Sequence, residues 1–171
     1  MDRVAWGKRV RDFMVSIEDY PTLNHRKSLK EAFLLLIESL EAGRDYRNVI
    51  VVGDRGELLG VLSMMDLVEG ILPSFLREPR AYQGHFQEDP GLSLIWQDIL
   101  ADAPRASVER KVGEALHPAK IVLHQEDPLT KAVYYMARHR LTLLPVVEGG
   151  KVVGVIRFLD IFKEISRVVL A

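Results

Sequence analysis

The sequence predicts a mixed α/β (α+β) fold: two β-α-β-β-α repeats packed with pseudo-twofold symmetry, with a helical insertion between them. Three observations lead to this prediction. One passage occurs twice, as GELLGVLSMMDL at 56–67 and as GKVVGVIRFLDI at 150–161, and the copies align without a gap. An amphipathic helical pattern precedes each copy, and a long stretch without a counterpart separates them. We therefore expect a first repeat at 1–72, an insertion at 73–110 and a second repeat at 111–171.

The long helix is the clearest element of the first repeat. Ser28 and Glu31 have the spacing of a capping box, and Gly43 suits the position just after a helix end. Two β-rich runs on either side of a turn at 54–56 predict a hairpin. The expected elements are a helical turn at 10–14, a strand at 21–23, a helix at 28–43, strands at 48–52 and 58–62, and a helix at 63–72.

The second repeat follows the same order. Asp127 can cap its long helix, and Pro128 suits the first helical position. Glycines at 149 and 150 predict the turn of the second hairpin. The expected elements are a helical turn at 112–116, a strand at 121–123, a helix at 128–137, strands at 143–147 and 152–156, and a helix at 157–169.

The insertion at 73–110 is far longer than the ~4–6 residues typical of connections inside a domain. Its second half has apolar residues at helical spacing between Pro90 and Pro104, which predicts a helix that packs on the body. The apolar residues of this pattern are Leu92, Ile95, Trp96, Ile99 and Leu100.

Composition excludes several classes of function. The 23 basic and 24 acidic residues nearly cancel, so the chain has no strong field to attract nucleic acid or an anionic membrane. The absence of Cys excludes disulfides, thiolate nucleophiles and cysteine metal sites. No apolar run approaches the ~20 residues of a membrane helix, and the N-terminus lacks a signal core. We expect a cytoplasmic protein.

No pattern typical of catalysis is present. The glycines of the first hairpin do not form the dinucleotide fingerprint, and no phosphate-binding loop of a nucleoside triphosphatase occurs. Ser63 lacks the flanking glycines of a nucleophile elbow. The five histidines, in no metal-ligand spacing, are His25, His85, His117, His124 and His139. We expect neither catalytic residues nor a metal site, and we predict that the protein is not an enzyme.

The repeated pattern resembles the tandem CBS domain pair, also called the Bateman module. The resemblance rests on the strand-helix-strand-strand-helix order, on LPVV at 144–147, and on Gly-apolar-apolar-Ser-x-x-Asp at 60–66. It covers nearly the whole chain except the insertion. It implies two clefts that bind AMP, ADP, ATP or another adenosyl ligand, in a regulatory module that senses energy or metabolite levels and needs no cofactor.

In such a cleft, an Asp in the first turn of a helix can accept hydrogen bonds from both ribose hydroxyls, and the helix start with its Ser suits a phosphate. Ser63 and Asp66 match the pattern better than the second copy, where Arg157 replaces Ser. Arg157 either neutralises a phosphate or fills the Asp160 site itself. The nucleotide-binding residues implied by the resemblance are Thr22, Val51, Gly60, Ser63, Asp66, Val122, Pro145, Gly154, Arg157 and Asp160.

A second hypothesis needs no ligand. Ser63 and Asp66 also have the spacing of a capping box, a structural device worth about 1 kcal/mol. The chain would then be a scaffold for oligomerisation or protein interaction. In either case the five consecutive apolar residues at 33–37 give the long helix two apolar faces. The resemblance favours a homodimer that covers the second face, and burial under the insertion that contains Trp96 is the alternative. A regulatory module would also need an effector protein, which the sequence does not identify.

Overall fold

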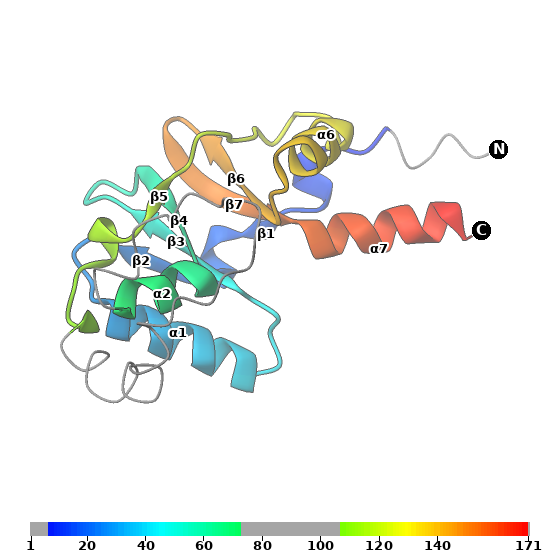
Figure 1. The fold of residues 1–171 in the computed structure, drawn as a ribbon. Coiled ribbons are helices and arrows are strands. Elements are labelled where there is room, and N and C mark those ends of the chain that lie inside the picture. Colours follow the sequence, from blue (N-terminus) through cyan, green and yellow to red (C-terminus); the bar gives the residue numbers. More distant parts are fainter. Residues whose placement is uncertain (1–6, 73–106, 171) are drawn as a thin grey trace, which may run out of the picture.

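Two small β-sheets lie face to face at the centre of the molecule, and two helices cover the outer side of each sheet (Figure 1). The computed structural model describes residues 7–72 and 107–170. The helix expected between Pro90 and Pro104 lies outside these residues. The mixed α and β architecture with two similar halves is the predicted one, and the long helices, the hairpins and the last helix of each repeat are confirmed. The strand expected at 121–123 is wrong: only Leu123 forms an isolated bridge there, to Val146, and the short strand of this region is at 117–118.

The first sheet has four strands in the order β2-β3-β4-β5, and α1 and α2 cover it. The capping box of α1 forms as predicted, with Ser28 accepting from the Glu31 N–H and Glu31 accepting from the Ser28 N–H. The bounds are β2 Thr22–Asn24, α1 Leu29–Glu41, β3 Asn48–Val52, β4 Leu58–Ser63, α2 Met64–Ile71 and β5 His117–Pro118.

The second sheet has three strands in the order β1-β7-β6, covered by α6 and α7. The prediction that Asp127 caps α6 is wrong: the N-cap is Pro128, and the Asp127 carboxylate instead accepts hydrogen bonds from His124 and Lys131. The bounds are β1 Val15–Ser16, α6 Leu129–His139, β6 Leu143–Glu148, β7 Lys151–Arg157 and α7 Phe158–Val169. Short 3-10 turns are η2 Val10–Asp12, η3 Ile17–Asp19 and η4 Val112–Glu114.

Successive side chains of the central strands point alternately into two hydrophobic cores. On β3, Val49 and Val51 face the helices while Ile50 faces the other sheet, and on β6 Leu144 faces its helices while Leu143 faces β3 and β4. Apolar side chains on both faces explain why these strands read as continuous apolar runs. The packing makes four layers: α1 and α2, the first sheet, the second sheet, then α6 and α7.

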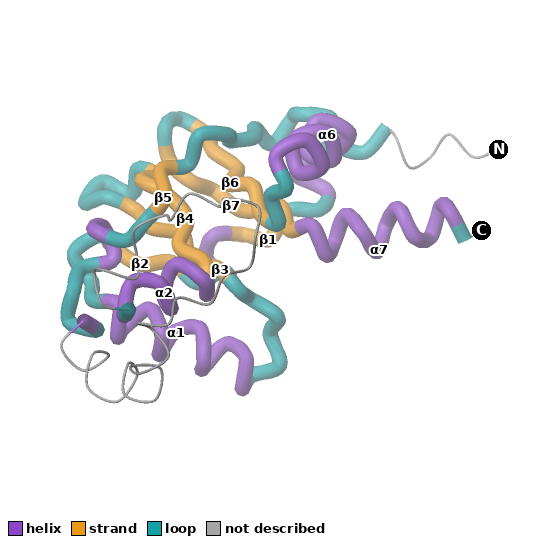
Figure 2. Tube along the Cα trace, viewed as in Figure 1, coloured by secondary structure: helices purple, strands orange, loops and turns teal. Residues whose placement is uncertain are grey.

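The first helical turn and first short strand of each repeat pack against the other repeat. Strand β1 pairs with β7 of the second repeat, and β5 pairs with β4 of the first, as the tube in Figure 2 shows. The helical turns cross as well, because Val10 is buried against α6 and α7, whereas Val112 is buried against α1 and α2. The two repeats therefore depend on each other for a complete sheet and core.

Gly60 and Gly154 make room for these crossing strands. A Cβ at Gly60 would overlap the backbone carbonyl of His117, and a Cβ at Gly154 would lie 2.6 Å from the Val15 carbonyl oxygen. Both obstacles are backbone atoms, which have little freedom to move aside. The equivalent glycines of the repeat thus have one shared structural cause.

We expect Gly60→Ala and Gly154→Ala each to lower the free energy of unfolding by about 1–3 kcal/mol, because the added methyl group overpacks a backbone contact. Urea unfolding followed by circular dichroism measures this loss. Gly7→Ala is the matched control, since nothing lies within 4 Å of a Cβ at that position. Full stability of both variants would show that the crossing strands do not constrain these glycines.

Several large apolar side chains remain exposed on the outer helices. The exposed residues include Leu34, Ile37 and Leu40 of α1, Met65 and Val68 of α2, and Leu159 and Phe162 of α7.

None of the helices within residues 7–72 and 107–170 is long and apolar enough to cross a membrane.

Candidate functional site

Ser63 and Asp66 form a capping box at the start of α2. The Asp66 Oδ2 atom accepts a hydrogen bond of 2.6 Å from the Ser63 backbone N–H, and the Ser63 Oγ atom accepts one of 3.1 Å from the Asp66 N–H. The structural role proposed for this pair is therefore present. It engages only one of the two carboxylate oxygens of Asp66.

The other carboxylate oxygen faces a histidine of the second repeat. Asp66 Oδ1 lies 3.0 Å from His117 Nε2, at the point where β5 crosses to the first sheet. The Asp66 side chain is 14% exposed, whereas that of His117 is 74% exposed. Because His117 lies mostly in solvent, its ring can turn away at little cost and leave Oδ1 to accept from another donor.

A cavity of about 590 Å³ lies beside Asp66. Its walls come from both repeats: the ends of β3, β4 and α2, the chain from β5 to Ile121, and the connection from α6 into β6. Val61, Ile121 and Pro145 give it an apolar side. The volume lies within the range of small-molecule sites, about 300–1,000 Å³.

The polar side of this cavity is basic. Among the described residues that line it, Asp66 is the one acidic residue, while Lys120, His139 and Arg140 line it together with His117. Within residues 7–72 and 107–170, no ion pair joins Lys120, His139 or Arg140 to another residue. Arg140 has left-handed backbone angles, φ 55° and ψ 36°, and ends α6 there. The cavity therefore combines one carboxylate with two cationic side chains, Lys120 and Arg140, and two imidazoles.

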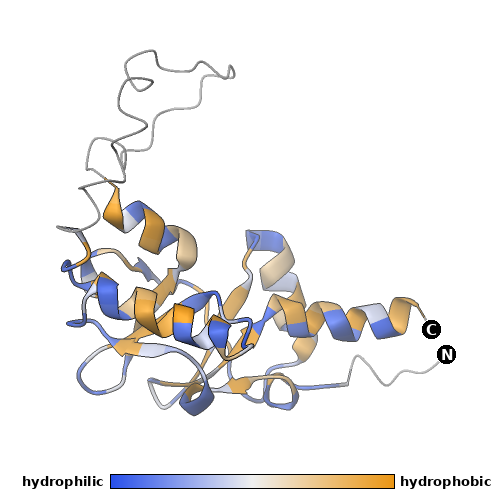
Figure 3. Cartoon of the chain, turned by 90° about the horizontal axis from the view of Figure 1, so that it is seen from below, coloured by the Kyte–Doolittle hydropathy of each residue, from blue (hydrophilic) through white to orange (hydrophobic). Residues whose placement is uncertain are grey.

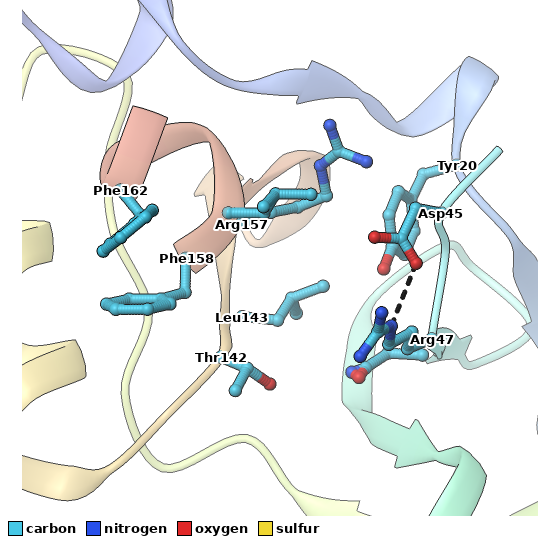
Figure 4. A pocket seen from close by; sticks show the side chains of 10 residues that line it. Tyr20, Asp45, Arg47, Thr142, Leu143, Arg157, Phe158 and Phe162 are labelled. Carbon is cyan, nitrogen blue, oxygen red and sulfur yellow. Dashed lines mark hydrogen bonds and ion pairs between the residues drawn. The ribbon is translucent and has the colours of Figure 1, made fainter. Parts of the chain in front are cut away.

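A second cavity, of about 330 Å³, lies at the start of α7 (Figure 4). It shares Asn48, Thr142 and Leu143 with the first, so these residues separate the two. Arg157 takes the position that Ser63 has in the first repeat. Its Nε and Nη2 atoms donate to the two oxygens of Asp160 at 2.6 and 2.8 Å. Both acceptor oxygens of Asp160 are therefore occupied by its own chain.

Arg157 is held from two sides. Its guanidinium carbon lies 5.3 Å from the centre of the Tyr46 ring, and the side chains of the Arg157–Asp160 pair are each only about one-fifth exposed. Burial works against its charge, but the hydrogen bonds and the charge of Asp160 outweigh this and raise the pKa of Arg157. Arg157 is thus a fixed, fully paired cation.

The other predicted residues lie apart from the first cavity, except Pro145. Val51 is buried in the core under α1, and Thr22 lines a separate hollow of about 520 Å³, where its hydroxyl donates to the Tyr20 carbonyl. Gly60 and Gly154 face the crossing strands, and Val122 is half-buried beside the bridge from Leu123 to β6. No group of three or more His, Cys, Asp or Glu in the described part of the chain is placed to hold a metal ion.

The sequence profile of the CBS domain matches residues 10–73 and 112–167, which include both halves of the fold described above. The chain belongs to the CBS domain family. Among proteins with curated functions, none matches the sequence.

Solved structures share the fold of this CBS pair. A CBS domain-containing protein of unknown function from Bacillus anthracis has a TM-score of 0.69 at 21% identity, with 95% of each chain covered. CBSX2 in complex with AMP has a TM-score of 0.66 at 21% identity, covering 95% of this chain and 98% of the other. The cytosolic domain of the Mg²⁺ channel MgtE in complex with ATP has a TM-score of 0.61 at 19% identity. The alignment with MgtE covers 91% of this chain but only 48% of the MgtE chain.

The basic residues of the first CBS cavity were not predicted from the sequence. Metal-ligand spacing, the pattern that the histidines lack, does not indicate a basic cavity wall. The run Arg138-His139-Arg140 at the end of the α6 pattern is a local signal that could have been noticed. No local signal identifies His117 or Lys120, because the crossing of β5 brings them to the first repeat.

Proposed function

We propose that this CBS pair is a regulatory module that binds an adenine nucleotide in the cavity beside Asp66. One observation supports this most directly: the cavity contains a carboxylate oxygen within reach of a donor, and two cationic side chains, Lys120 and Arg140, without an ion-pair partner among the described residues. A ribose diol and a phosphate chain are the groups that such a set recognises.

The residues suggest how the ligand lies. A ribose hydroxyl would take the place of His117 against Asp66 Oδ1, while the capping box keeps the carboxylate in position through Oδ2. The base would lie on the apolar side formed by Val61, Ile121 and Pro145. Lys120 and Arg140 would neutralise the phosphates, and His139 would donate a hydrogen bond from its ring N–H. AMP and ATP complexes of CBSX2 and MgtE support the ligand class.

A thermal-shift series with AMP, ADP, ATP, NADH and S-adenosylmethionine tests the proposal. A ligand at 100 times its dissociation constant stabilises by about 2.7 kcal/mol, which raises the melting temperature by roughly 5–10 °C for a chain of this length. We expect the phosphorylated ligands to give the larger shifts at low salt, because the cationic wall attracts them. Absence of any shift, together with no nucleotide in a native mass spectrum of freshly purified protein, would contradict the proposal.

The observed capping box favours the competing function, a ligand-free scaffold. The same thermal-shift series separates the two, since a cap needs no ligand. For a regulatory module, the nucleotide must bind one arrangement of the CBS pair more tightly than another, and an effector protein must recognise the difference. The existence of such an effector protein is part of this proposal.

A second copy of the chain is the proposed cover for the exposed helix faces. The apolar residues recur at equivalent positions of the two repeats: Met65 matches Leu159, and Val68 matches Phe162. Figure 3 shows apolar residues along these outer helices. A face repeated by pseudo-twofold symmetry suits a partner with the same symmetry.

Sedimentation velocity is expected to give a dimer, and the double substitution Val68→Glu with Phe162→Glu is expected to give a monomer, because two buried charges oppose association. Val168→Glu is the matched control, since Val168 is an exposed apolar residue of α7 without an apolar counterpart in α2. A monomeric wild-type protein at the same concentration would contradict the proposal.

A further inference from the structure

The second cavity differs in chemistry from the first. Its charged residues are paired within the protein: Arg157 with Asp160, and Arg47 Nε with Asp45 Oδ1 at 2.9 Å. A phosphate group entering this cavity would therefore have to compete with a carboxylate for either arginine. A ribose diol would have to displace Arg157 from both oxygens of Asp160.

The remaining walls are aromatic and apolar. Tyr20, Phe158 and Phe162 line the cavity from both repeats, and the two phenylalanine rings lie 6.1 Å apart. Burial raises the pKa of the Tyr20 hydroxyl, so this ring is neutral at physiological pH. Figure 4 shows the two Phe side chains on one side of the hollow and Tyr20 on the other, with Leu143 between them.

We infer that this cavity binds an uncharged, planar aromatic or heteroaromatic compound without a phosphate, stacked against Phe158 and Phe162. Aromatic rings attract one another in stacked and edge-to-face arrangements by about 0.5–1.5 kcal/mol per pair beyond the burial of area. Because each arginine is balanced by a carboxylate, the cavity offers an anion little net attraction, and its volume of about 330 Å³ is at the lower end for small-molecule sites. This inference does not depend on nucleotide binding at Asp66.

Titration with 5-fluoroindole, followed by ¹⁹F NMR, tests the inference on the full chain. We expect saturable binding with a dissociation constant on the order of 1 mM or lower, as suits a ligand of this size. Phe158→Ala should weaken binding by about threefold to tenfold, because it removes one aromatic contact. Phe158 is partly exposed, so the variant should fold.

Val168→Ala is the matched control: Val168 is as exposed as Phe158, at 43%, and lies on the same helix outside the cavity lining. It should leave the affinity unchanged. An anionic analogue, 5-fluoroindole-2-carboxylate, should bind more weakly than 5-fluoroindole. Three results would each overturn the inference: no binding of 5-fluoroindole, equal affinity of the Phe158→Ala and wild-type proteins, or tighter binding of the carboxylate.

A further arm separates this inference from the proposed function. Saturating AMP should leave the 5-fluoroindole affinity unchanged, and Asp66→Ala should do the same, because Asp66 does not line the second cavity. Displacement of 5-fluoroindole by AMP would assign both ligands to one site and overturn the inference. If AMP does not bind at all, the proposed function fails while the fluoroindole result still decides this inference.

Discussion

Asp66→Ala is expected to weaken AMP binding by about 10- to 150-fold while leaving the protein folded. The substitution removes the Oδ1 acceptor for a ribose hydroxyl, and a hydrogen bond to a charged group contributes roughly 1.5–3 kcal/mol. Isothermal titration calorimetry with AMP measures the loss. Retention of wild-type affinity would contradict the assignment of Asp66 to the diol.

The same substitution also removes one half of a capping box, so its control must lose a cap without touching the cavity. Glu31→Ala meets this need, because Glu31 has the same capping role at the start of α1. Both variants should lose a similar free energy of unfolding, about 0.5–2 kcal/mol, and only Asp66→Ala should lose AMP. Equal loss of AMP binding in both variants would instead point to general destabilisation.

Arg157→Ser is expected to open a second site for an adenine nucleoside. The substitution removes both hydrogen bonds that occupy Asp160 and restores the residue found at Ser63. The new hydroxyl can accept from the Asp160 N–H as Ser63 does from Asp66, which offsets part of the lost ion pair. Titration with adenosine should show one additional binding event per chain relative to wild type.

The expected preference for adenosine follows from the paired charges of this cavity. Arg47 remains bound to Asp45, so AMP should gain little from its phosphate there. Ser63→Arg is the reciprocal variant: its guanidinium should pair with Asp66 and close the first site to AMP, as Arg157 closes the second. An Arg157→Ser protein that binds no more adenosine than wild type would show that the ion pair is not what excludes the diol.

Much of the fold could be predicted from local patterns. The periodicity of α1, its Ser28–Glu31 box and the β-rich runs on either side of Gly56 depend on neighbouring residues, so their positions followed directly. The one wrong cap illustrates the limit. Asp127 has the residue type of an N-cap, but its carboxylate bonds to the His124 N–H, and the chain enters the helix one residue later.

The candidate site was only partly predictable. Ser63 and Asp66 were identified because the duplicated passage contains them, whereas Gly60, Val51 and Thr22 follow the same pattern but face a crossing strand, the core and another hollow. A sequence pattern fixes which residues lie near one another along the chain. It does not fix which side chains face a space that two distant segments enclose.

The sequence by itself determined the two repeats, the order of their long helices, hairpins and last helices, and the duplicated acid at the start of each last helix. Tertiary structure alone decided that β1 and β5 exchange between the repeats, that His117 and Lys120 join the Asp66 cavity, and that Asp160 is taken by Arg157. The physical reason is the separation along the chain of the residues that interact. Helix capping and strand periodicity are local, whereas exchanged strands and shared cavities depend on contacts between residues far apart in the chain, which no local pattern encodes.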